Sequence, residues 1–182
     1  MPHYAALIRG ITPSNPNMTG AALRGVFEEL GFADVASVLA SGNIVFGSEA
    51  SDVSTLEKRI EQALGDELGI PGRTIVRSHD ELRTLLDSDP FPGLTHGRGT
   101  YLTATFLKDA APPALPAEHR DGLSRLVGYD PAARAVLAVT DNSVPGRTPD
   151  FMVWLEKNYG KDITTRTWLT VQRIVKKLDA RT

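Results

Sequence analysis

Two short polar segments contain the side chains best suited to hold an anion. Ser41-Gly42-Asn43 offers a hydroxyl, an amide and backbone N–H groups, which can form an anion-binding concavity because Gly and Asn tolerate positive φ angles. Thr165-Arg166 stands before an expected helix, whose N-terminus favours negative charge, and a guanidinium can hold a phosphate or carboxylate through two hydrogen bonds. With Arg9, which ends an expected strand, these residues predict a polar cleft for a small anionic molecule at the junction of two subdomains.

Each segment also has a purely structural interpretation. Ser41-Gly42-Asn43 contains the residue types that a tight hairpin turn needs for backbone reasons alone. A threonine before Arg166 is a suitable helix N-cap, and the guanidinium could pair with an internal carboxylate. The sequence leaves both interpretations open at both segments.

Several kinds of chemistry lack the residues they require. The chain has no cysteine, which excludes disulfides, thiolate metal sites and cysteine nucleophiles. Its four histidines stand apart, none at metal-ligand spacing with another histidine or a suitable carboxylate pair. The glycine string at 96–99 lacks the third glycine of a dinucleotide-binding motif, and the P-loop and hydrolase motifs are absent. We therefore predict no metal and no cofactor, while the catalytic residues, if any, are not identified and the question of enzymatic activity stays open.

Charge suggests a second kind of function. The net charge is −2 and the isoelectric point is near 6.1, so the chain as a whole has no basic character that would attract nucleic acid. From residue 158 to the end, however, six basic residues stand against two acids. Arg173, Lys176 and Lys177 lie on one side of the expected last helix. The alternative prediction is a non-catalytic nucleic-acid or protein interaction module that uses this basic helix.

The hydropathy pattern predicts a cytoplasmic protein without a membrane partner. No run of about 18 apolar residues occurs, which is the length needed to cross a bilayer. Arg9 interrupts the first apolar stretch, so the start does not read as a secretory signal. The absence of cysteine fits a reducing compartment.

The first half has a regular succession of elements. The expected elements are a strand at 3–9, a helix between Thr19 and Gly31, a hairpin of strands at 35–39 and 44–46, a helix at 52–68 and a strand at 73–77. This order, β-α-β-β-α-β, is that of the split βαβ or ferredoxin-like unit. It predicts an α+β protein with a first subdomain at 1–77.

The rest of the chain is expected to begin with a linker and end in helices. Residues 78–98 form the linking segment, where Ser78 and Glu81 make a capping box that opens a short helix. The second subdomain covers 99–182. Its expected elements are strands at 100–107 and 135–140, a turn at 129–131, and helices at 117–126, after Thr148-Pro149 and after Thr164-Thr165-Arg166.

Three segments together resemble a known family. They are Ala6-Leu7-Ile8-Arg9-Gly10-Ile11, then Leu30-Gly31-Phe32 through Leu39-Ala40-Ser41-Gly42-Asn43-Ile44-Val45-Phe46, and Ile163-Thr164-Thr165-Arg166-Thr167-Trp168-Leu169-Thr170-Val171. In this order they are similar to the bacterial domain of unknown function 1697 family. The resemblance implies a tandem pair of α/β-plait (ferredoxin-like) subdomains and no particular reaction. The loop at 12–17 departs from the Gly-Gly and basic stretch usual in the family, so a role for it in anion binding stays open.

Overall fold

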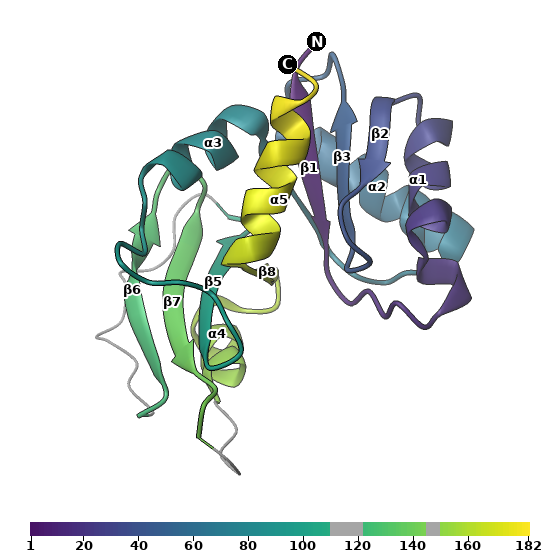
Figure 1. Cartoon of the computed structure of the whole chain (residues 1–182). Helices are drawn as coiled ribbons and strands as arrows, with labels where there is room; N and C mark the ends of the chain where they lie inside the picture. The colour runs from purple at the N-terminus through teal and green to yellow at the C-terminus, as the bar shows by residue number, and fades with distance from the viewer. Residues whose placement is uncertain (110–121, 145–149) are drawn as a thin grey trace. The chain divides into compact units, whose positions relative to one another are not determined.

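The chain folds into two compact units, each built on a four-stranded antiparallel sheet (Figure 1). One unit comprises Met1–Leu82 and Arg173–Thr182, and the other comprises Arg83–Gln172. The predicted α+β class is confirmed. The computed structural model describes residues 1–109, 122–144 and 150–182.

The first unit has the predicted order β-α-β-β-α-β. Its strands lie in the order β2-β3-β1-β4, and every neighbouring pair is antiparallel. The elements are β1 (His3–Ile8), the 3-10 helix η1 (Pro16–Met18), α1 (Gly20–Glu29), β2 (Ala33–Ser37), β3 (Asn43–Gly47), α2 (Val53–Leu68) and β4 (Thr74–Ser78), followed by α3 (His79–Asp87).

The core of the first unit lies between one face of this sheet and the helices α1 and α2. β1 contributes Tyr4, Ala6 and Ile8, which alternate along the strand and so point to the same face. Phe27 of α1 packs on Phe46 of β3 with ring centroids 5.4 Å apart. The helix α1 starts where expected, because the Thr19 side chain accepts a hydrogen bond from the Ala22 N–H.

Glutamate side chains cover the outer edge of β4. The outward N–H groups of an edge strand would otherwise be open to another strand. Here three of them donate to carboxylates: Thr74 to Glu61 at 2.9 Å, Val76 to Glu57 at 2.9 Å and Ser78 to Glu81 at 2.8 Å. The Glu81 N–H donates in return to the Ser78 hydroxyl at 3.2 Å, which confirms the predicted capping box.

The second unit repeats the strand order of the first. Its sheet has the order β6-β7-β5-β8, so β5, β6, β7 and β8 take the places of β1, β2, β3 and β4. Phe151 and Leu155 of α4 pack with Leu107, Val136 and Ile163 on one face. The elements are β5 (Thr100–Leu107), β6 (Ser124–Asp130), β7 (Ala135–Asp141), α4 (Phe151–Tyr159) and β8 (Ile163–Thr167), followed by α5 (Trp168–Asp179).

The helix predicted at 117–126 is wrong for its described part. Residues from Ser124 onward form β6, where Ser124 is buried and Arg125 and Val127 are exposed, the alternation of a strand. The turn predicted at 129–131 begins only after Asp130. Residues 117–121 and the predicted cap Thr148-Pro149 lie outside the described residues, and α4 begins at Phe151.

The last ten residues group with the first unit, whereas the sequence placed them in the second half. His79 Nε2 lies 2.7 Å from Asp179 Oδ1, and Arg181 Nε donates to the Asp34 carbonyl at 3.0 Å. Both contacts join positions at least 100 residues apart. Local periodicity carries no information about such contacts.

Of the helices in the described part of the chain, none combines the length and apolar character that a membrane span requires.

Candidate functional site

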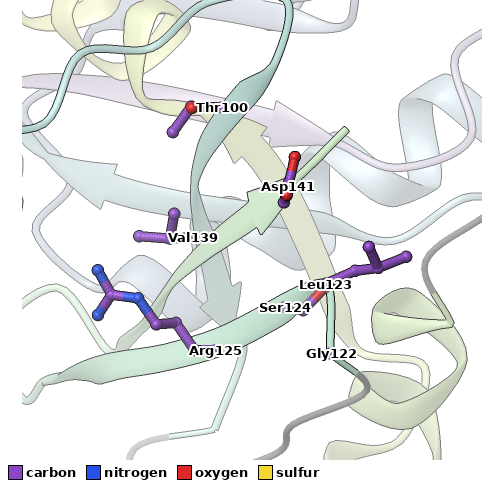
Figure 2. A pocket seen from close by; sticks show the side chains of 7 residues that line it. All are labelled: Thr100, Gly122, Leu123, Ser124, Arg125, Val139 and Asp141. Carbon is purple, nitrogen blue, oxygen red and sulfur yellow. The ribbon is translucent and has the colours of Figure 1, made fainter. Parts of the chain in front are cut away.

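A cavity of about 450 Å³ lies at one end of the second unit's sheet (Figure 2). Because neighbouring strands are antiparallel, β5 and β6 begin at the end where β7 finishes. The cavity is lined by Thr100 of β5, by Gly122, Leu123, Ser124 and Arg125 at the start of β6, and by Val139 and Asp141 of β7.

The strand register places the polar lining residues on one face. Arg125 lies directly opposite Val139, and Thr100 lies directly opposite Asp141. Val139 and Asp141 are two residues apart on β7, so their side chains point the same way. The Asp141 N–H also donates to the Leu123 carbonyl, which holds Leu123 beside the end of β7. The cavity therefore has an apolar floor between two charged side chains.

Arg125 is the cation of this cavity. It is exposed, and its guanidinium forms no hydrogen bond or ion pair with any residue that the structure describes. Figure 2 shows the side chain extending past Val139. A guanidinium carries five N–H donors in a planar fork that matches a carboxylate or phosphate. Arg125 is therefore the group in this cavity that can bind an anion.

Asp141 is the anion of the cavity, and it is held in place by Ser143. Its Oδ1 accepts hydrogen bonds from the Ser143 hydroxyl and from the Ser143 N–H, the latter at 2.8 Å. These bonds, the hydroxyl first, hold the pKa of Asp141 below its ordinary value. The carboxylate is thus ionised at neutral pH.

The seven residues that line the cavity include no histidine, lysine or cysteine. The Ser124 hydroxyl is hydrogen-bonded to that of Thr140 at 3.1 Å in the buried interior. No group of three or more His, Asp or Glu side chains within 1–109, 122–144 and 150–182 could hold a metal ion. The arrangement supports binding and assigns no reaction.

Four of the predicted site residues lie at one end of the first unit's sheet. Arg9 follows the last residue of β1, and its N–H donates to the Arg73 carbonyl at 2.9 Å. The preceding residue, Ile8, donates its N–H to the Gly42 carbonyl at 2.9 Å. The structure thus brings the end of β1 against Ser41 and Gly42 of the turn and Asn43, the first residue of β3.

The observed contacts of this turn are structural. The Asn43 side chain is buried, and its amide donates to the Val38 carbonyl and to the Ser41 hydroxyl, each at 3.0 Å. Gly42 has φ +79, and a Cβ there would lie 2.5 Å from Cγ1 of Ile11. Glycine at position 42 and asparagine at position 43 are therefore both needed to close the turn. Their participation in ligand binding stays a prediction.

Thr165 and Arg166 lie in the second unit, inside β8. The Thr165 hydroxyl contacts that of Thr105 at 2.8 Å, and Arg166 lies opposite Ala104. The predicted helix does follow them, because α5 begins at Trp168, but both residues are paired with β5 as part of the strand and neither caps the helix. Thr167 stands at the start of α5, where its hydroxyl accepts from the Thr170 N–H at 3.4 Å.

The Arg166 guanidinium is directed at its own strand. It donates to the Thr164 hydroxyl at 2.7 Å and to the Thr165 carbonyl at 3.0 Å. Desolvation by the surrounding protein lowers its pKa to about 10, so the side chain remains charged at neutral pH. The six predicted residues divide between the two units, and their use of one common ligand stays a prediction.

Sequence reasoning missed the residues that line the cavity. Arg125 fell within the predicted helix, so its alternation with the buried Ser124 was not used. A second missed residue is Arg77, which is fully buried on β4 opposite Ala5. It occupies the position in the first sheet that Arg166 occupies in the second, just before the Ser or Thr that precedes a helix. The shared strand–Arg–Ser/Thr–helix pattern is the sequence signal for this equivalence.

Comparisons with known proteins give a family and a fold. The family model described as a protein of unknown function (DUF1697) matches residues 1–124. No curated protein gives a significant match. A solved structure, the conserved bacterial protein SP0830 from Streptococcus pneumoniae, is similar with a TM-score of 0.75 and 20% sequence identity. The similarity covers 98% of this chain and 99% of that one. At this identity it shows a common fold alone.

Proposed function

This chain belongs to the DUF1697 family of proteins of unknown function, and from that premise we propose that it binds a small ligand with an anionic group. The ligand occupies the cavity at the end of the second sheet, where Arg125 holds the anion. The observation that carries the proposal is the Arg125 guanidinium, which lines the cavity and has no partner among the described residues.

The size and lining of the cavity support this function. Ligand pockets commonly measure about 300–1,000 Å³ and combine apolar walls with a few polar groups. The volume here is about 450 Å³, and Leu123 and Val139 supply apolar surface. An anion that meets Arg125 gains charge-assisted hydrogen bonds, which are among the stronger polar contacts in water. A small organic acid or phosphate ester fits this combination.

The same proposal includes the finer class of the fold and the location. We take both units to be α/β plaits of the ferredoxin-like type, because their strand orders match each other and the first unit has the order β-α-β-β-α-β. The lack of cysteine supports a reducing compartment, and the cytoplasm is the location we propose.

A binding titration with matched variants tests the proposal. The probes are acetate and inorganic phosphate, followed through backbone amide shifts of the 15N-labelled full chain. We expect saturable shifts at Leu123, Arg125 and Asp141, and affinity at least about tenfold weaker in Arg125→Ala, the value of one charge-assisted hydrogen bond. Arg173→Ala is the control, since it removes the same charge from the exposed face of α5.

Two outcomes would overturn the proposal. One is an Arg125→Ala variant that keeps its fold, by circular dichroism, and binds both probes as tightly as the unaltered chain. The other is an equal loss of affinity in Arg173→Ala, since that would make binding a matter of net charge.

A nucleic-acid interface on α5 is the second candidate. The observation in its favour is that Arg173, Lys176 and Lys177 are all exposed at helical spacing on one side of α5. Phosphate contacts weaken steeply as salt rises, so binding of single-stranded RNA or duplex DNA would be measured at about 50 and 200 mM salt. Absence of binding at the lower salt concentration rejects this candidate.

A further inference from the structure

The cavity of the second unit contains two charges of opposite sign that do not neutralise each other. Arg125 and Asp141 form no ion pair, although both line the same hollow. They occupy diagonal positions on β6 and β7, since Arg125 is opposite Val139 and Asp141 follows two residues later. In a regular antiparallel ladder such positions are about 7–8 Å apart. Val139 lies between the two side chains (Figure 2), so a ligand that meets both charges has to reach across it.

One oxygen of Asp141 is available to a ligand. Both hydrogen bonds from Ser143 go to Oδ1. Oδ2 accepts no hydrogen bond from any residue that the structure describes. Ser143 thus orients the carboxylate and leaves its second oxygen as an acceptor. An ammonium or another N–H donor is the complementary group.

The surface between the two charges is apolar. Figure 2 shows Val139 between the Arg125 and Asp141 side chains. Leu123, which is buried, lies beside Asp141 across the strand pair. Aliphatic carbon is the chemistry that such a surface accommodates, because contact removes apolar area from water.

A simple anion satisfies only one of the two charges in this cavity. Its negative group would bind Arg125 but would also feel the Asp141 carboxylate on the diagonal position, and like charges repel. A ligand with a second, positive group converts that repulsion into attraction. The lining therefore discriminates between an anion and a zwitterion of the same length.

We propose that the ligand is a small zwitterion with a carboxylate for Arg125, an ammonium group for Asp141 and an aliphatic chain over Val139. This inference rests on the proposed function and names its ligand class, an ω-amino acid or a molecule that carries the same groups. Because the two protein charges stand on either side of Val139, ligands with several methylene groups fit better than an α-amino acid.

Paired probes of equal length test the inference on the full chain. Amide shifts are followed with butyrate and 4-aminobutyrate, then with hexanoate and 6-aminohexanoate, and with glycine as the short zwitterion. We expect each ω-amino acid to bind about tenfold more tightly than its parent acid, the effect of one charge-assisted hydrogen bond, and glycine to bind more weakly. In Asp141→Asn the ratio of the ω-amino acid's affinity to that of its parent acid should fall to about one. Asp66→Asn, which removes an exposed acid on α2, should leave this ratio unchanged.

The outcomes separate this inference from the function on which it rests. Equal binding of 4-aminobutyrate and butyrate by the unaltered chain overturns the zwitterion and leaves the anion site standing. Absence of shifts at the cavity with every probe overturns both. The comparison within the unaltered chain needs no variant, so an Asp141→Asn protein that fails to fold would not prevent the decision.

Discussion

Replacement of Gly42 by alanine should destabilise the first unit far more than the same replacement at Gly10. The two glycines have nearly the same left-handed backbone, with φ +79 and +78. They differ in space. A Cβ at Gly10 meets nothing within 4 Å, whereas a Cβ at Gly42 would lie 2.5 Å from Ile11 Cγ1 and 2.9 Å from the Ile8 carbonyl oxygen. The pair therefore separates backbone strain from steric crowding.

The expected magnitudes follow from that difference. An L-residue in the left-handed region costs about 1–2 kcal/mol, and alanine recovers roughly 0.4–1 kcal/mol by restricting the unfolded chain. Gly10→Ala should therefore cost about 1 kcal/mol or less. At Gly42 the Ile11 side chain and the Ile8 backbone must also move, which adds about 1–3 kcal/mol, as other overpacked sites do. We expect Gly42→Ala to cost roughly 1–4 kcal/mol, the crowding being the part that Gly10→Ala lacks.

Amide hydrogen exchange is the suitable assay. Both tryptophans, Trp154 and Trp168, lie in the second unit, so fluorescence would not follow the first. Protection of core amides in β1 measures the free energy of opening of the unit itself. Gly31→Ala, at φ +80 with nothing within 4 Å of its Cβ, is a second control and should behave like Gly10→Ala.

Equal losses of protection in the Gly42 and Gly10 variants would refute this reasoning. They would mean that the turn relaxes away from Ile11 without cost, and that close packing does not explain the glycine. The Ser41-Gly42-Asn43 turn would then require another explanation, with ligand contact the first to test.

Two further predictions concern the edge of β4 and the acid side of the cavity. Glu57→Leu should lower the free energy of unfolding by about 1–3 kcal/mol in urea, because the buried Val76 N–H loses its acceptor. Glu57→Gln should lose less, since its amide oxygen can still accept, and a Leu variant as stable as the unaltered chain would contradict this. Ser143→Ala should raise the pKa of Asp141 toward its ordinary value, because the hydroxyl that lowers it is gone. A carboxyl whose pKa is lower in the folded than in the unfolded chain stabilises the fold at pH values above the unfolded pKa, and this stabilisation is lost as the pH falls through the folded pKa. In the variant the folded pKa of Asp141 lies closer to the unfolded value, so this stabilisation should be smaller. A carboxyl 13C titration with an unchanged midpoint would count against the role of Ser143.

Much of the first unit could be read from local patterns. The stretch from His3 to Ser78 alternates clear strand and helix periodicities with turn residues, and the observed β-α-β-β-α-β order follows them. Caps such as Ser78 with Glu81 are local in sequence, and the predicted pairing was found. The predicted hairpin of the second and third strands was found for the same reason, because the backbone demands of its turn fall on adjacent residues, although Asn43 belongs to β3.

The second unit was harder to predict, for a physical reason. β6 contains Gly128 and a register shift between Leu126 and Gly128, which breaks the period of two that identifies a strand. The strand therefore shows no unbroken alternation from end to end. The strand is decided by pairing with β7, which is a contact between distant segments.

The amino-acid sequence by itself determined the α+β class, most of the elements of the first unit and the family to which the chain belongs. These properties depend on residues close together along the chain. Only the tertiary structure decided that Arg125, Val139 and Asp141 share one face, because their positions follow from the register of β6 on β7. It also decided that Gly42 lies against Ile11 and that the last ten residues join the first unit. The candidate site belongs to this second group, since a binding cavity is formed by side chains that only folding brings together.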